Sequence, residues 1–254
     1  MDLQLAGKRA LVTGGSRGIG RAVARRLSLE GADCALVART AGALAEAASA
    51  LAAESGRRVV GVAGDLAVAG TAERVAEEAA AALGGIDILV NCAARASGGV
   101  PEDLAHITDE LILRDFEEKF VGYLRCARAV VPWMRRAGWG RIVNVAGGAA
   151  RVAGSISAGA RNASVVHLTK TLAFELGPDG ITVNAVHPGT TATEAVLARL
   201  GAQAAQSAQG LAIRRLVTPD DLACTITFLC SPLAGGVTGE VLAVNGGAER
   251  GVRY

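Results

Sequence analysis

Apolar runs of strand length alternate with alanine-rich helical segments along the whole chain, and this alternation restricts the fold more than any other feature of the sequence. Continuous apolar strands separated by helices are typical of a parallel sheet that is covered by helices on both faces. We therefore expect one α/β domain over residues 1–254, with its ligand beyond the carboxyl ends of the strands. The predicted strands are 9–14, 33–38, 58–64, 86–91, 141–146, 181–187 and 240–245, and the predicted helices are 18–30, 40–54, 71–83, 115–137, 158–177 and 219–230.

Charge and composition favour a small-molecule partner. The net charge is +2, and the 26 basic and 24 acidic residues are interspersed, so neither nucleic acid nor a membrane surface is an expected partner. The N-terminal segment lacks the apolar core of an export signal, and turn residues interrupt the longest uncharged run, so we expect a cytoplasmic protein. The cysteines lack the C-x-x-C spacing of metal or redox sites, so we expect a reducing compartment and no bound metal; they are Cys34, Cys92, Cys126, Cys224 and Cys230.

A glycine-rich turn follows the first predicted strand and opens the first predicted helix. It reads TGGSRGIG, residues 13–20, with Gly14, Gly18 and Gly20 where the backbone turns tightly. In this setting glycines let a pyrophosphate approach the positive end of a helix. The turn predicts a dinucleotide site, although a merely structural turn is the alternative.

The end of the second predicted strand indicates which dinucleotide is bound. An NAD site usually has a carboxylate there for the ribose diol, whereas this chain has Ala38 and Arg39, and Arg17 lies within the glycine turn. Two guanidinium groups can pair with a 2′-phosphate. We therefore predict NADP(H), with two solvated surface arginines as the alternative.

These segments and several others, in the same order, resemble the classical short-chain dehydrogenase/reductase family. The matching segments are TGGSRGIG (13–20), GDL (64–66), VNCAA (90–94), GRIVNVAG (140–147), HPG (187–189) and TGEVLAVNGG (238–247). The resemblance implies a Rossmann-type doubly wound sheet of seven parallel strands, and a homodimer or homotetramer built on the two long helices. It also implies cofactor contacts from Gly14, Ser16, Arg17, Ile19, Gly20, Asp65, Leu66, Asn91, Ala93, Pro188, Gly189 and Thr193.

The catalytic tetrad of that family is absent. Alignment with the family pattern places Gly147 at the Ser position, Ala158 at the Tyr position and Asn162 at the Lys position, while Lys119 stands at the Asn position. In the family the Tyr is the general acid, the Lys lowers the pKa of the Tyr, and the Ser polarises the carbonyl oxygen. Side chains of Gly147 and Ala158 can do none of this, so the ordinary mechanism is excluded at these positions.

Lys119 and Asn162 occupy two of these places with the residue types exchanged. An ammonium group could therefore still reach the site, although Lys119 could equally point to solvent from the charged stretch RDFEEK. Tyr123 lies four residues after Lys119, on the same helix face, and is our first candidate for a substitute acid. Its alternative is a tyrosine that packs on a helix face or at a subunit contact.

Other candidate acids are weaker. His187 ends the sixth predicted strand beside the expected nicotinamide and could act as an acid or as an oxyanion partner. The terminal Tyr254 would need the tail to fold over its own or a neighbour's pocket. His167 is expected to pack or to lie in a subunit interface, and His106 to face solvent. Ser155 and Ser157 could supply a hydroxyl from the loop or only cap a helix.

Three functions are compatible with the sequence. The first is an NADP(H)-dependent oxidoreductase with a rebuilt acid, acting on a small, apolar carbonyl, alcohol or enone. The second is a nucleotide-binding enzyme of a non-redox step, an isomerase or a dehydratase. The third is a catalytically silent paralogue that binds NADP(H) and regulates or assembles with an active relative. The intact cofactor motifs favour the first function, and the absent tetrad favours the third.

Overall fold

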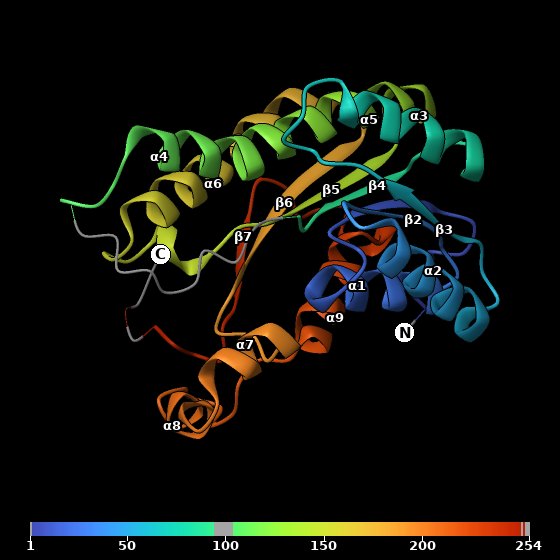
Figure 1. Cartoon of the computed structure of the whole chain (residues 1–254). Helices are drawn as coiled ribbons and strands as arrows, with labels where there is room; N and C mark the ends of the chain where they lie inside the picture. Colours follow the sequence, from blue (N-terminus) through green and yellow to red (C-terminus); the bar gives the residue numbers. More distant parts are fainter. Residues whose placement is uncertain (1, 94–103, 250, 252–254) are drawn as a thin grey trace.

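The computed structural model describes residues 2–93, 104–249 and 251. Within these residues, seven parallel strands form one sheet in the order β3-β2-β1-β4-β5-β6-β7. Helices α1, α2 and α9 cover one face of the sheet and α3, α5 and α6 cover the other, while α4 lies beside α6 (Figure 1). The order reverses between β1 and β4, as in Rossmann-type folds. The predicted doubly wound, seven-stranded, single-domain fold is confirmed.

The strands lie close to their predicted positions. The side chains of the five inner strands are mostly buried on both faces between the helical layers, which is why the sequence shows continuous apolar runs there, whereas the edge strands β3 and β7 are partly exposed. The strands are β1 (Arg9–Thr13), β2 (Asp33–Ala38), β3 (Val59–Ala63), β4 (Ile88–Asn91), β5 (Gly140–Val145), β6 (Ile181–Pro188) and β7 (Val241–Val244).

The helices agree with the prediction except in two places. They are α1 (Gly18–Leu29), α2 (Ala41–Ser55), α3 (Thr71–Leu83), α4 (Asp109–Phe116), α5 (Gly122–Ala137), α6 (Ile156–Leu176), α7 (Glu194–Leu200), α8 (Gln203–Gln209) and α9 (Pro219–Leu229). Thr218 caps α9 in a reciprocal box with Asp221, as the sequence suggests.

The predicted helix 115–137 was wrong at its start. The helical segment begins at Asp109, where the side chain of Thr108 accepts a hydrogen bond from the Leu111 amide. It continues through a π-helical turn, Glu117–Val121, before α5. None of the residues of α4 is buried, and Leu111 and Leu113 are exposed, so this helix is not part of the buried core.

No helix is predicted between β6 and α9, yet this segment contains the short helices α7 and α8. Neither helix has a buried residue, so no apolar stripe marks them in the sequence. Among the described residues, no helix combines the length and the apolar character that a membrane span requires.

Candidate active site

The glycine turn between β1 and α1 leaves no room for side chains on its inner side. A Cβ on Gly14 would lie 3.1 Å from the Ala93 nitrogen, and one on Gly20 would lie 2.3 Å from the Gly14 oxygen. Gly14 and Gly18 also have positive φ angles, of 68° and 56°. Ser16 and Ile19 lie in the same turn and are half-buried. The turn thus has the close backbone that a pyrophosphate cradle requires.

Arg17 and Arg39 are both exposed on this side of the sheet. Arg17 precedes α1, and Arg39 follows the last residue of β2. Parallel strands end at the same edge of the sheet, so both residues lie at the edge where ligands of this fold bind.

The predicted adenine and ribose contacts lie after β3 and β4. Asp65 is exposed and its Oδ1 accepts a hydrogen bond from the Ala67 amide at 3.1 Å, which fixes the turn, while Leu66 is buried. Asn91 is fully buried and donates from Nδ2 to Oδ1 of Asn144 at 2.9 Å. The Ala93 amide donates to Thr13 Oγ1, tying this segment to β1.

The end of β6 lies against the glycine turn. A Cβ on Gly18 would lie 3.4 Å from Cγ2 of Thr193, so residues far apart in sequence meet across the predicted cofactor site. Thr193 also caps α7, accepting from Val196. Pro188 ends β6, and a Cβ on Gly189 would lie 2.8 Å from Cα of Asn245. The predicted nicotinamide-end residues therefore gather at one edge.

The residues at the four tetrad positions are also brought together. Gly147 follows β5, and a Cβ on it would lie only 2.8 Å from Nδ2 of Asn162. The Asn162 side chain thus occupies the space that a serine at position 147 would need. Asn162 is buried, and its Nδ2 donates to the Ala158 carbonyl at 2.8 Å.

Lys119 points inward, not to solvent. Its residue exposure is 4%. Its Nζ donates to the carbonyl of Ala146 at 2.9 Å and to Oδ1 of Asn162 at 2.8 Å. Burial, and to a smaller extent the charge of Arg161, lower the pKa of the ammonium to about 7, against smaller opposite effects of Cys92 and Asp115. Lys119 thus carries an exchangeable proton near neutral pH at the end of β5.

Tyr123 lies beside Lys119 but is engaged elsewhere. Its hydroxyl donates to the carbonyl of Val145 at 3.1 Å, and the residue is 1% exposed. Burial raises the pKa of this phenol well above its usual value. The Lys119 Nζ lies 5.9 Å from the centroid of the ring. Among the predicted catalytic residues, Lys119 and Asn162 are in direct contact, and Tyr123 flanks them.

The other histidines and serines divide between surface and interior. His187 is 1% exposed in β6, opposite Ala243 of β7. His106 is exposed, as expected, and His167 is also exposed, so it does not pack within this chain and the interface alternative stays a prediction. Ser155 caps α6 by accepting from the Ala158 amide at 3.2 Å. Tyr254 and Ala94 lie outside the described residues.

Sequence reasoning missed a buried ion pair next to this group. Arg161 of α6 pairs with Asp115 of α4, and the hydroxyl of Ser157 donates to the same carboxylate. The two roles expected of Ser157, a loop hydroxyl or a helix cap, do not include this contact. A signal existed, because Ser157 and Arg161 are four residues apart and therefore share one face of α6. Their partner on α4 lies 46 residues away from Arg161 and could not be found from spacing.

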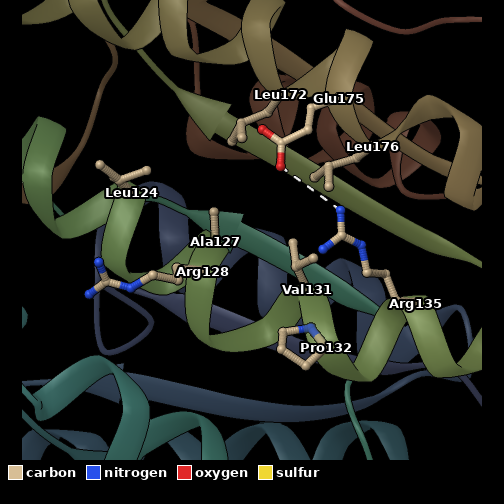
Figure 2. A pocket seen from close by; sticks show the side chains of 9 residues that line it. All are labelled: Leu124, Ala127, Arg128, Val131, Pro132, Arg135, Leu172, Glu175 and Leu176. Carbon is tan, nitrogen blue, oxygen red and sulfur yellow. Dashed lines mark ion pairs between the residues drawn. The ribbon is translucent and has the colours of Figure 1, made fainter.

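A separate groove lies on the outer side of α5 and α6, with a volume of about 340 Å³. Figure 2 shows Leu124, Val131 and Leu172 facing it, with the ion pair of Arg135 and Glu175 across one end. None of the predicted cofactor or catalytic residues lines the groove. The groove belongs to the surface of the helical layer and not to the edge where the strands end.

Comparison with known proteins gives a consistent family assignment. A family model described as enoyl-(acyl carrier protein) reductase matches residues 14–249. The short-chain reductase protein NovJ of Streptomyces niveus is 38% identical over 248 residues, which cover 94% of this chain and 92% of that protein.

Two solved structures share the fold at a similar level of identity. The L-sorbose reductase of Gluconobacter frateurii in complex with NADPH and L-sorbose superposes with a TM-score of 0.91, at 33% identity, over 99% of this chain and 100% of that one. A short-chain dehydrogenase of Burkholderia cenocepacia in complex with NADP gives a TM-score of 0.87, at 35% identity, over 96% of this chain and 99% of that one. With its switch point, its glycine turn and these relatives, the chain belongs to the short-chain dehydrogenase/reductase family of oxidoreductases.

Proposed function

We propose that the protein is an NADP(H)-dependent oxidoreductase of a small, apolar carbonyl, alcohol or enone, in which Lys119 takes over the proton-carrying role of the absent tyrosine. One observation carries this proposal. The buried Lys119 Nζ is held between the Ala146 carbonyl and Asn162, among the residues at the positions of the family's tetrad. The silent-paralogue alternative gives no reason for a buried lysine at this place.

The cofactor assignment rests on the glycine turn and on two exposed arginines. Gly14 and Gly20 leave the space that a pyrophosphate needs, and Arg17 and Arg39 stand where a 2′-phosphate would be paired. Two structural relatives bind NADPH or NADP, which supports the same choice here. Bound NADP(H) would supply or accept the hydride.

The Lys119 ammonium has one more N–H donor than its two acceptors use. An ammonium group has three N–H donors, and two of them are donated to Ala146 and Asn162. The third is available to an oxygen of the substrate. When Lys119 is a neutral amine, its lone pair points where the third N–H group pointed. Lys119 can therefore give a proton to a carbonyl oxygen in reduction and take one from an alcohol in oxidation.

Asn162 and Gly147 hold this arrangement in place. The Asn162 amide donates to Ala158 and accepts from Lys119, so both ends of the amide are engaged. Gly147 provides the space that the amide occupies. We assign Asn162 as the positioning residue of Lys119 and Tyr123 as a support, because the phenol proton is donated to Val145. His187 remains the candidate oxyanion partner at the end of β6.

The proposed assembly is a homodimer or homotetramer through α5 and α6. The groove on these helices has an apolar floor that includes Leu124, Val131 and Leu172. The family resemblance implies assembly on the same two helices. A second copy of the chain would cover this apolar surface.

The decisive experiment titrates NADPH and NADH by fluorescence and then follows their absorbance with a panel of carbonyls and enones. We expect tighter binding of NADPH than of NADH, and turnover of at least one substrate that is lost in Lys119→Met. If neither NADPH nor NADH binds, the proposal is rejected. Tight NADPH binding without turnover would favour the silent paralogue, and conversion of substrate without a change in nucleotide absorbance would favour the isomerase or dehydratase.

A further inference from the structure

A second buried cation lies beside Lys119 and has its own counter-ion. Arg161 and Asp115 form an ion pair whose side chains are 6% and 14% exposed. The Ser157 hydroxyl donates to the second carboxylate oxygen of Asp115. The three residues join α6 to α4, so the position of the Arg161 charge is fixed by contacts from two helices.

Each residue of this pair is close in sequence to Lys119 or to its acceptor. Asp115 lies four residues before Lys119 on the same helical segment, and Arg161 directly precedes Asn162, the acceptor of the Lys119 ammonium. The titratable and charged groups that face Lys119 are Arg161 from α6, Cys92 from the segment after β4, Asp115 from α4 and the ring of Tyr123 from α5.

The charges in this cluster do not balance when Lys119 is protonated. Among the residues that the structure describes, two buried cations would then share one carboxylate, which is unfavourable away from water. Arg161 cannot relieve the excess, because a guanidinium group stays protonated in proteins. The neutral amine of Lys119 is the form that balances the cluster.

We propose that Arg161, anchored by Asp115 and Ser157, is a positioning residue for Lys119 whose charge favours the neutral amine and so lets Lys119 exchange its proton near neutral pH. This inference deepens the proposed function, since it explains how a lysine can replace a tyrosine as the acid. The largest charge effect on the pKa of Lys119 is that of Arg161, and it has the required direction. No direct contact between Arg161 and the substrate is needed.

The lysine content makes the proton of Lys119 directly observable. The chain has only three lysines, Lys8, Lys119 and Lys170. Protein labelled with ¹³C at lysine Cε will therefore give three lysine NMR signals, and the one missing in Lys119→Met belongs to Lys119. We expect the Lys119 signal to titrate near pH 7.

Substitutions of Arg161 and of Asp115 should move the midpoint of the Lys119 titration in opposite directions. Arg161→Met should raise the midpoint by roughly one pH unit or more, and Asp115→Asn should lower it. Arg161→Lys keeps the charge and should restore much of the shift. The matched control is Arg9→Met, which opens the ion pair with Asp87 at the opposite end of the sheet and should leave the midpoint unchanged.

An unchanged Lys119 midpoint in folded Arg161→Met would overturn the inference, as would equal shifts in the Arg9→Met control. If Arg161→Met fails to fold, Asp115→Asn decides: a downward shift supports the inference and no shift rejects it. This experiment needs neither cofactor nor substrate. The absence of turnover would therefore reject the proposed function alone. A Lys119 midpoint that does not shift in these variants, together with normal turnover of the wild type, would reject this inference alone.

Discussion

The Lys119 ammonium lies 2.8 Å from the side-chain oxygen of Asn162, so the two residues that exchange types relative to the family are direct hydrogen-bond partners. They come from the π-helical turn before α5 and from α6, 43 residues apart. Replacing one residue of this pair by an apolar one therefore leaves the other as a buried polar group without its partner. Substitutions at these two positions thus test the arrangement.

Lys119→Met is expected to lower turnover by about 10² to 10⁴-fold, because it removes the proposed proton donor. NADPH affinity should change little, since Lys119 lies among the tetrad positions and not in the glycine turn. Steady-state kinetics with fluorescence titration will measure both quantities. Lys170→Met is the control, because Lys170 is exposed and pairs with Glu240 at the surface. Equal loss of turnover in both variants would contradict a specific role of Lys119.

Stability should rise with pH between 7.5 and 8.5. The folded protein releases the Lys119 proton at about pH 7, whereas the unfolded chain keeps it up to about pH 10.5, so the unfolded chain binds more protons in this interval. The free energy of unfolding should increase by about 1 kcal/mol per pH unit, and the contribution is lost as pH falls towards 7. Urea titrations at several pH values will measure the slope.

Lys119→Met should remove most of that slope. The pH range in which stability rises ends below pH 9, because burial raises the pKa of the thiols of Cys34, Cys92 and Cys126 to about 12. For these groups the folded state binds more protons above pH 9, so they lower stability as pH rises further. A slope that persists in Lys119→Met would show that another group causes it.

Gly147→Ser, which restores the family's serine, is expected to damage the protein. The new Cβ would lie 2.8 Å from Nδ2 of Asn162, so the amide must move and release Lys119. We expect a loss of about 1–3 kcal/mol in the free energy of unfolding, together with lower turnover. Gly148→Ser is the matched control, since the nearest atom to its Cβ, Oε1 of Glu249, is 4.0 Å away. A more active Gly147→Ser variant would refute the proposed site.

Arg39→Ala should weaken NADPH binding by about tenfold or more and leave NADH binding almost unchanged, because a hydrogen-bonded charge pair contributes about 1.5–3 kcal/mol. Arg17→Ala should act in the same direction. Fluorescence titrations with both nucleotides will give the ratio of affinities. Arg136→Ala removes a cation that stacks on Trp133, away from the glycine turn, and serves as control. A parallel loss for NADH and NADPH would contradict the 2′-phosphate assignment.

Leu124→Glu should dissociate the proposed assembly, because it introduces a charge into the apolar groove on α5 and α6. Light scattering coupled to size-exclusion chromatography will give the molar mass of wild type and variant. Leu233→Glu, at a residue that is 45% exposed elsewhere on the surface, is the control. A wild-type protein that is monomeric at micromolar concentration would refute assembly altogether.

The sequence by itself determined the layered α/β fold, the glycine turn and the loss of the family's tetrad. These features depend on local patterns: apolar runs of strand length, glycines at fixed spacing, and residue types at aligned positions. They predicted every strand to within two residues at either end. The start of the helical segment at Asp109 and helices α7 and α8 were not predicted, because these segments bury no residues and so do not belong to the core that the apolar runs reveal.

Only the tertiary structure decided how the changed residues are used. From the sequence, Lys119 could face either solvent or the site, because the direction of a side chain depends on the helical phase, and a π-helical turn alters that phase. The contacts of Lys119 with Asn162 and of Arg161 with Asp115 join residues more than 40 positions apart. Local spacing carries no information on such pairs, because they form only when the sheet and its helical layers have placed α4, α5 and α6 side by side.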